Sequence, residues 1–443
     1  MKSSKILHAL VVLFLAFSNI AFSKSAAPEL PNIVLVLTDD QTFESLPAMP
    51  FVSSQGWFSF TNTFTNVALC CPARATILSG KYSHKSGVET NHLGFLHNET
   101  SDIAARLNGA GYETAYFGKY LNGYPWGRGL YVPPGWDKWS IFLRLTRTTR
   151  YYYDYSMVEK NLAETVYGSR SGDYSTTVLA KKAIEFIKTA QTPFSLFLAV
   201  FAPHTPYIPA PRHLNADVGV AKRYPNYNED DVSDKPAWVQ ALPRRDSQAV
   251  DKIRLDQYRA LLAVDEAVEK IVRALKRRGI YRNTVIIFMS DNGYAIGEHR
   301  HIGKICEYDE CLRIPLLIHL PKFADREIPQ LVSNVDIAPT IADLAGIPQD
   351  GFDGSSLIPL MIDTNIPWRE EILFRWAGDP LEVKIPPFWG VRTALWKYVE
   401  LETGERELYD LINDPYEMNN RYGKPGYEAV IQDLQIRLEN IKK

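Results

Sequence analysis

Three apolar runs, each followed directly by polar residues, constrain the fold of this 443-residue chain more than any other feature. Continuous apolar runs without polar alternation are typical of strands that are buried on both faces of a sheet. The runs and the polar residues after them are 31–38 with Asp39 and Asp40, 194–200 with His204, and 284–289 with Asp291 and Asn292.

Helical patterns lie between these runs, at residues 175–188 and 255–278, with apolar positions at three- and four-residue spacing. Strands that alternate with amphipathic helices predict an α/β fold with a large mixed, mostly parallel sheet flanked by helices. In such sheets ligands bind outside the carboxyl ends of the strands. We therefore expect the polar strand ends to converge on one site.

The pattern changes after about residue 365. Short runs at 368–376, 389–401 and 407–411 predict antiparallel strands, and residues 427–441 predict a closing helix. We interpret residues 28–364 as a catalytic domain. Residues 365–443 then form a small C-terminal α+β subdomain with a short antiparallel sheet.

The first 23 residues have the pattern of a signal peptide: Lys2 and Lys5, an apolar stretch at 6–17, and a small-x-small cleavage site at 21–23. The apolar stretch is too short for a comfortable membrane span. An uncleaved anchor is the alternative. Cleavage predicts a secreted or periplasmic protein, or a lysosomal one in a eukaryotic host, with no stable membrane span.

Composition adds two limits. The formal net charge of −2 provides no bulk field that would favour nucleic acid, so we expect no nucleic-acid partner. Four cysteines in an exported chain of this length indicate that disulfides do not hold the fold together. Cys306 and Cys311 could pair.

Residues 70–74 read Cys-Cys-Pro-Ala-Arg, with proline two places and arginine four places after Cys70. Taken alone, Cys70 could be a buried structural cysteine or half of a vicinal disulfide. Together with the polar strand ends, the motif resembles the signature of the sulfatase family, which has the alkaline-phosphatase-like fold. The resemblance implies that a formylglycine-generating maturation enzyme oxidises Cys70 to Cα-formylglycine.

The resemblance also implies one Ca²⁺ ion per chain. Carboxylate and amide oxygens are the ligands that such hard cations prefer. Taken singly, the Asp-Asp and Asp-Asn pairs are equally typical of helix N-caps and turns. The implied ligands are Asp39, Asp40, Asp291, Asn292 and the formylglycine from Cys70.

The implied mechanism begins with attack on sulfur by one hydroxyl of the hydrated aldehyde, with Asp291 accepting its proton. The second hydroxyl then expels inorganic sulfate. Arg74 would hold the hydrate, Lys119 and Lys304 would bind sulfate, and either His204 or Lys304 would protonate the leaving alcohol. His299 and His301 are further candidates.

One departure from the common family pattern bears on the substrate: Leu121 stands where many arylsulfatases have histidine. The segments 39–41, 70–71 and 118–122 instead resemble the N-acetylglucosamine-6-sulfatase-like branch, which implies a sulfated saccharide such as glucosamine 6-sulfate. Aromatic residues at 124–139 and 151–153, including Trp126 and Trp136, could stack on sugar rings or only pack their loops. An arylsulfatase, a phosphoesterase or phosphonate hydrolase, and an inactive glycan-binding pseudoenzyme are the alternatives.

Overall fold

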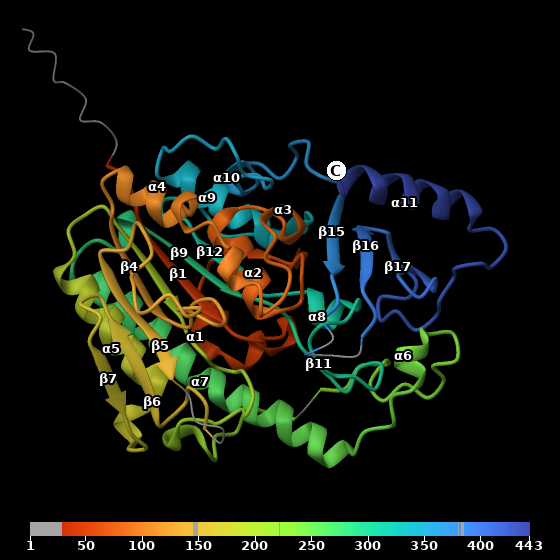
Figure 1. Ribbon diagram of the computed structural model, residues 1–443, viewed down its shortest axis with the longest axis horizontal. Coiled ribbons are helices and arrows are strands. Elements are labelled where there is room, and N and C mark those ends of the chain that lie inside the picture. The colour runs from red at the N-terminus through yellow and green to blue at the C-terminus, as the bar shows by residue number, and fades with distance from the viewer. Residues whose placement is uncertain (1–28, 145–148, 221, 380, 382–384) are drawn as a thin grey trace, which may run out of the picture. The chain divides into compact units, whose positions relative to one another are not determined.

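A mixed sheet of ten strands runs through the part of the chain that the computed structural model describes, residues 29–144, 149–220, 222–379, 381 and 385–443 (Figure 1). The predicted signal peptide, residues 1–23, lies outside the described residues. The strand order is β13-β2-β12-β9-β1-β8-β4-β5-β6-β7. The strands are β1 Asn32–Thr38, β2 Phe58–Phe60, β4 Glu113–Gly118, β5 Lys138–Arg144, β6 Tyr155–Glu159, β7 Glu164–Tyr167, β8 Phe194–Ala199, β9 Thr284–Ser290, β12 Leu316–His319 and β13 Glu327–Ile328.

The middle of this sheet, β9-β1-β8-β4-β5, is parallel. Strands β12, β6 and β7 join it in antiparallel orientation toward the edges. The predicted strands at 31–38, 194–200 and 284–289 are β1, β8 and β9, which lie side by side. The predicted α/β architecture with a mostly parallel sheet is therefore confirmed.

Helices cover both faces of the sheet because alternate residues of each central strand point to opposite sides. Val34 and Val36 of β1 pack against one helical layer, and Ile33 and Leu35 pack against the other. The first layer contains α1 Pro50–Ser54, α5 Ser175–Thr189 and α7 Ser247–Arg277. The second contains α2 Cys70–Ser79, α4 Ile103–Gly109, α9 Ile337–Leu344 and α10 Ile358–Ile362.

Helix α5 matches its predicted range closely, whereas α7 begins eight residues before the predicted residue 255. Its N-cap is Asp246, whose carboxylate accepts a hydrogen bond from the backbone N–H of Gln248 at 2.9 Å. Such a cap satisfies an amide that has no partner within the helix. The added turns contain few large apolar residues, Val250 and Ile253, so apolar periodicity alone did not reveal them.

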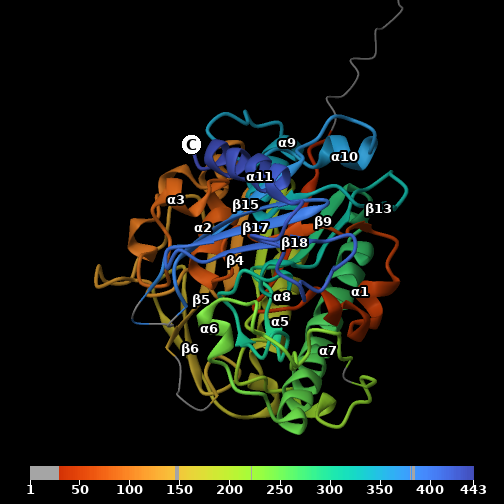
Figure 2. The same cartoon turned by 90° about the vertical axis from the view of Figure 1, so that its right-hand side faces the viewer.

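A four-stranded antiparallel sheet, β15 Glu371–Trp376, β16 Phe388–Thr393, β17 Trp396–Leu401 and β18 Arg406–Asp410, follows within the described residues (Figure 2). The apolar run at 389–401 is thus two strands joined by a tight turn. Helix α11, Glu428–Ile441, packs Leu434 and Leu438 onto this sheet. Residues 31–443 form one compact unit, and the boundary at 365 stays a prediction.

The cysteines and aromatic residues resolve several alternatives. Cys306 and Cys311 form a disulfide, whereas Cys70 and Cys71 are free, so a vicinal disulfide is excluded. Trp136 and Tyr152 are buried in the core, so the expectation that they meet sugar rings is wrong. Among the described residues no helix combines the length and the apolarity that a membrane crossing requires.

Candidate active site

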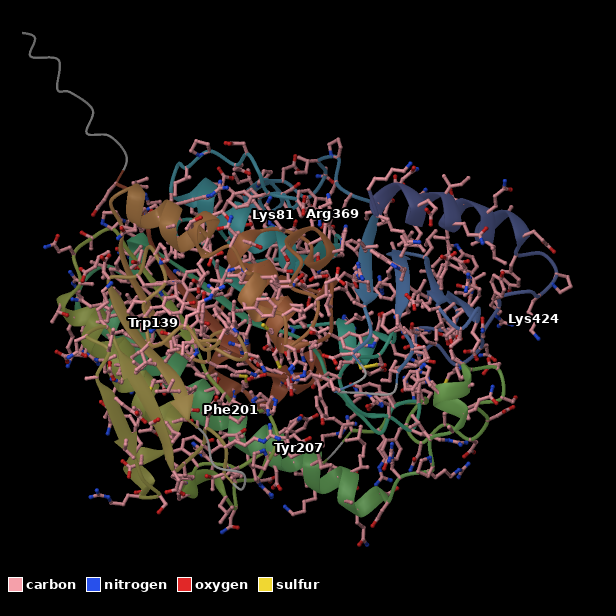
Figure 3. All side chains as sticks on the ribbon, viewed as in Figure 1. Lys81, Trp139, Phe201, Tyr207, Arg369 and Lys424 are labelled. Atoms are coloured by element: carbon pink, nitrogen blue, oxygen red, sulfur yellow. A yellow bond between two sulfur atoms is a disulfide. The ribbon has the colours of Figure 1, made fainter. Side chains whose placement is uncertain are left out.

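Four neighbouring parallel strands, β9, β1, β8 and β4, end at the same edge of the sheet, and the predicted site residues follow these ends. Asp291 follows β9, Asp39 and Asp40 follow β1, and Lys119 follows β4. The loop after β8 carries His204 between Phe201 and Tyr207, the two residues of this loop labelled in Figure 3. The predicted convergence of polar strand ends is therefore what the fold produces.

Cys70 is the first residue of α2, a helix whose ten residues are all buried. Its Sγ lies 2.5 Å from Lys304 Nζ and 3.5 Å from Asp39 Oδ1. Burial raises the pKa of this thiol to about 12, so the thiol is protonated at neutral pH. Since the thiolate is the nucleophilic form of cysteine, the unmodified side chain is a poor nucleophile here.

Each carboxylate of the site has a cationic partner. Lys119 Nζ lies 2.5 Å from Asp39 Oδ2, Lys304 Nζ lies 2.8 Å from Asp40 Oδ1, and Arg74 Nε lies 2.8 Å from Asp291 Oδ2. All these side chains are buried or nearly so. The structure thus brings Cys70, Arg74, Lys119 and Lys304 together around three carboxylates.

The three carboxylates do not share one charge environment. Burial opposes ionisation of Asp39, but Lys119, His204 and Arg74 outweigh it and hold the pKa of Asp39 far below its usual range. Burial and the negative charge of Asp39 raise the pKa of Asp291 to about 6. Asp291 is therefore the carboxylate best placed to take up a proton near neutral pH.

A divalent cation fits this site. Ligand atoms of Asp39, Asp40, Cys70 and His204 all lie within 4.8 Å of one another. Asp40 Oδ2 and Asn292 Oδ1 are buried and have no hydrogen-bond partner among the residues described. Because hard cations prefer oxygen ligands, these two oxygens are suited to bind one.

Asn292 and Asp291, both predicted metal ligands, differ in the hydrogen bonds that their side chains already make. The Asn292 amide nitrogen donates to Asp40 Oδ1 at 2.7 Å, which holds the two side chains together. Asp291 Oδ1 accepts hydrogen bonds from the backbone N–H groups of Asp40 and Asn292, and its Oδ2 accepts one from Arg74. Asp40 itself has φ of 64°, a strained conformation for a residue with a side chain.

His204 is neutral at physiological pH because burial lowers its pKa to about 4. Its Nδ1 donates to the carbonyl oxygen of Thr205 at 2.8 Å, so Nε2 carries no proton. Nε2 lies 3.5 Å from Asp40 Oδ2. The imidazole therefore presents a bare nitrogen to the centre.

The glycine before Lys119 has a steric cause. Gly118 has φ of 117°, and a Cβ at this position would lie 1.9 Å from the carbonyl oxygen of Ala199. The Lys119 N–H donates to that same carbonyl at 2.8 Å, which ties the end of β4 to the end of β8. No residue with a side chain fits there, so glycine fixes where Lys119 enters the site.

The two other histidines lie outside the centre. His299 is buried, donates from Nδ1 to Glu229 at 2.7 Å, and stacks on Tyr308. His301 Nε2 donates to the carbonyl oxygen of Lys304 at 3.2 Å, so it supports the backbone of that residue. Both histidines contribute to structure in this arrangement.

A cavity of about 220 Å³ adjoins the centre and begins at Lys119 and His204. Leu121 is buried in the core, and both Leu121 and Asn122 contribute to the lining of the cavity. Tyr151 lines it as well, so this part of the aromatic prediction survives. Arg150 also lines it, and sequence analysis missed this residue because an isolated loop arginine has no informative spacing.

Comparison with known proteins shows to which family this chain belongs. The family model described as Sulfatase matches residues 31–347. The chain belongs to the sulfatase family. A second model, N-sulphoglucosamine sulphohydrolase, C-terminal, matches residues 297–443 of this sulfatase. The predicted family is thus confirmed, and the enzyme class is that of the sulfuric ester hydrolases.

Individual relatives agree. An N-acetylglucosamine-6-sulfatase from Homo sapiens is 33% identical over 472 residues, which covers 93% of this chain and 84% of the relative. An extracellular sulfatase SULF-1 homolog from Drosophila melanogaster is 34% identical over 394 residues, which covers 80% of this chain but only 34% of the relative. This sulfatase therefore spans about a third of the Drosophila protein.

A solved structure of a protein in complex with its substrate D-glucosamine-2-N,6-O-disulfate matches with a TM-score of 0.80 and 27% identity. The match covers 93% of this chain and 97% of that one. Both the sheet and the C-terminal region therefore follow a known sulfatase architecture.

Proposed function

We propose that this sulfatase releases inorganic sulfate from sulfated saccharides, with glucosamine 6-sulfate as the first substrate to test. The observation that carries the proposal is the position of Cys70 at the N-terminus of a buried helix, among Arg74, Lys119 and Lys304. The singly charged sulfate ester would lie against three cations and the positive end of the helix. The alcohol part would extend into the adjoining cavity.

The proposed nucleophile is the formylglycine made from Cys70 by a maturation enzyme. Its hydrated aldehyde supplies two hydroxyls, one to attack sulfur and one to release sulfate. The high pKa of the unmodified thiol supports this assignment, because the thiol itself offers no reactive anion. Arg74 would stabilise the hydrate from its position beside Asp291.

Proton transfer would use residues on opposite sides of Cys70. Asp291, with its raised pKa, is suited to accept the proton of the attacking hydroxyl. For the leaving alcohol, the charge states favour Lys304 over His204. The ammonium of Lys304 contacts Cys70 Sγ and carries a proton, whereas neutral His204 would first have to take up a proton from solvent.

The proposed cation is one Ca²⁺ ion held by Asp39, Asp40, Asp291, Asn292 and the modified Cys70. It would draw charge from the sulfate oxygens as a Lewis acid. The unsatisfied oxygens of Asp40 and Asn292 support its location. With the cation bound to these carboxylates, Lys119 and Lys304 would be released to contact the substrate.

The saccharide assignment rests on two supports. The human relative is named for N-acetylglucosamine 6-sulfate, and the cavity beside Lys119 has an aromatic residue, Tyr151, in its wall. We also propose cleavage of a signal peptide at residues 1–23 and secretion, as the name of the extracellular Drosophila relative supports. The catalytic domain would then be residues 28–364 and the C-terminal subdomain 365–443.

The test measures initial rates of anion release from N-acetylglucosamine 6-sulfate, an aryl sulfate and an aryl phosphate, with Cys70→Ala as the blank. The proposal expects sulfate release from the sugar. Turnover of the aryl sulfate without any sugar sulfate would establish an arylsulfatase instead. Preference for the aryl phosphate would indicate a phosphoesterase on the same fold.

A further inference from the structure

The cavity beside the active site is lined by a cationic side chain, Arg150, that the proposed mechanism does not use. It begins at Lys119 and His204 and extends to Arg150. Its volume of about 220 Å³ has room for one saccharide unit, and a neighbouring unit would lie outside it. A substrate whose sulfate lies at Cys70 would therefore place the first sugar in this cavity and its substituents near Arg150.

Part of the lining of the cavity is a series of aromatic rings that begins with His204. The rings of His204 and Phe201 have centroids 4.7 Å apart, and those of Phe201 and Tyr151 5.2 Å apart. Tyr151 stacks on Phe142 at 4.6 Å with an interplanar angle of 14°. Phe201 and Phe142 therefore fix the position of the Tyr151 ring in the lining of the cavity.

The segment around Asn122 also lines the cavity. The indole nitrogen of Trp126 donates to the backbone carbonyl of Asn122 at 2.8 Å, which anchors this segment. The side-chain oxygen of Asn122 has no hydrogen-bond partner among the described residues. Asn122, the residue after Leu121, therefore contributes a polar side chain to the lining of the cavity.

Arg150 is exposed, and its guanidinium has no carboxylate partner within the described ranges 29–144, 149–220, 222–379, 381 and 385–443. Its φ of 48° lies in the left-handed region, which is uncommon for a residue with a side chain. Strained residues of this kind cluster at ligand sites. By contrast, Arg74 at the centre already faces Asp291, so Arg150 is the cation of this cavity that is available to a new anion.

We propose that Arg150 binds a second anionic group on the saccharide and so makes the enzyme selective for doubly charged over singly charged substrates. The inference rests on the proposed function, since it needs a sugar sulfate at Cys70. The second anion is a sulfate or a carboxylate, either on the same ring or on the neighbouring sugar. The planar guanidinium suits both groups, because it pairs with them through two parallel hydrogen bonds.

The test compares Arg150→Gln, Arg150→Lys and the control Arg170→Gln, whose arginine side chain is 95% exposed and does not line the cavity. Three substrates distinguish the source of the anion. They are N-acetylglucosamine 6-sulfate, glucosamine 2-N,6-O-disulfate, and a disaccharide in which a uronate neighbours N-acetylglucosamine 6-sulfate. The quantity measured is the ratio of kcat/KM between each doubly charged substrate and the singly charged one.

We expect the unaltered enzyme to prefer at least one doubly charged substrate by about 10- to 100-fold, the range of a charge-assisted hydrogen bond. Arg150→Gln should abolish that preference and leave the singly charged substrate within about 2-fold, while Arg150→Lys should keep part of it. A merely structural role would lower all three rates together. Equal rates on all substrates, or an unchanged ratio in Arg150→Gln, would overturn the inference alone. No sulfate release from any sugar by the unaltered protein would overturn the proposed function and the inference with it.

Discussion

Two buried clusters of acidic and basic side chains in this molecule differ in their place in the fold and in the contacts of their charged groups. The first is the active centre. The second, which we call the Lys397 cluster, consists of Asp309, Arg392, Lys397 and Glu417. The C-terminal sheet contributes Arg392 and Lys397. In the Lys397 cluster the ammonium group contacts Asp309 at 2.6 Å, Glu417 at 2.5 Å and the carbonyl oxygen of Glu307 at 3.0 Å.

The ammonium of Lys397 has three acceptors for its three N–H groups, so its own hydrogen-bonding capacity is used within the cluster. Arg392 adds a further ion pair to Asp309 at 3.1 Å. The active centre, by contrast, leaves Asp40 Oδ2, Asn292 Oδ1 and Arg74 Nη2 without hydrogen-bond partners among the described residues. Burial and charge alone therefore do not mark a functional site; the position of the charged groups at the carboxyl ends of parallel strands does.

The largest effect expected is on the nucleophile. Cys70→Ser should lower kcat by about 10⁴-fold or more, because serine has only one hydroxyl and offers no route for sulfate release. The control Cys71→Ser should leave formylglycine at position 70 and measurable turnover. A Cys70→Ser enzyme that turns over catalytically at the wild-type rate would contradict the mechanism.

Asp40→Asn should separate the two clusters by metal content. Loss of this carboxylate should remove the bound divalent cation and lower kcat by about 10²- to 10³-fold. The matched change in the Lys397 cluster, Glu417→Gln, should leave both the metal content and kcat unchanged in the folded protein. Elemental analysis of purified protein, read beside the rates, checks both variants. Full activity in a demonstrably metal-free enzyme would end the cation assignment.

Lys397→Met should show the reverse pattern, a loss of stability without a loss of chemistry. Removing one partner of a buried ion pair leaves uncompensated charge, which typically costs about 3–5 kcal/mol of unfolding free energy. Denaturant unfolding measures this loss, and kcat per folded molecule should not change. If kcat fell while the unfolding midpoint stayed constant, the division between structural and functional clusters would be wrong.

A smaller effect distinguishes the proton donor within the active centre. Lys304→Ala should slow a sugar sulfate about 10- to 100-fold more than an activated aryl sulfate, because a sugar alkoxide needs protonation to leave. His204→Ala, measured on the same two substrates, is the matched comparison. Equal losses on both substrates would exclude general-acid roles for these residues.

The smallest effect is a pH dependence of stability from Glu417, whose pKa burial raises to about 7 despite the nearby Lys397. The folded protein holds this proton more tightly than the unfolded chain, so the stabilisation is complete below about pH 4.5 and is lost as pH rises through 7. The slope from one such group is at most about 1.4 kcal/mol per pH unit. Glu417→Gln should remove that slope in thermal scans from pH 5 to 8, and an identical slope in both proteins would contradict the assignment.

The sequence predicts the centre of this molecule better than its edges, for a physical reason. Strands β1, β8 and β9 are buried on both faces and therefore read as unbroken apolar runs. Strand β7 is mostly exposed, with a run of polar and apolar residues that no buried-strand pattern would identify. Asp39, Lys119 and Asp291 could be predicted because each follows a strand end or lies in a recognisable segment.

The sequence did not reveal which side chains are buried or which partners they contact. The stretch that holds Trp136 and the run with Tyr152 look like sugar-binding surfaces in sequence, yet the fold buries both residues. His299 resembles a catalytic candidate by position, and only its contact with Glu229 reveals a structural role. Arg150 carries no sequence signal, because its significance depends on a cavity formed by distant segments.

The most direct test of the account is the mass of the peptide that contains Cys70 and Cys71, taken from active enzyme purified from its natural host. We expect an aldehyde at position 70 and an unmodified cysteine at position 71, with the extent of conversion matching the specific activity for sulfate release across preparations. A fully active preparation in which Cys70 remains a free thiol would contradict the central claim.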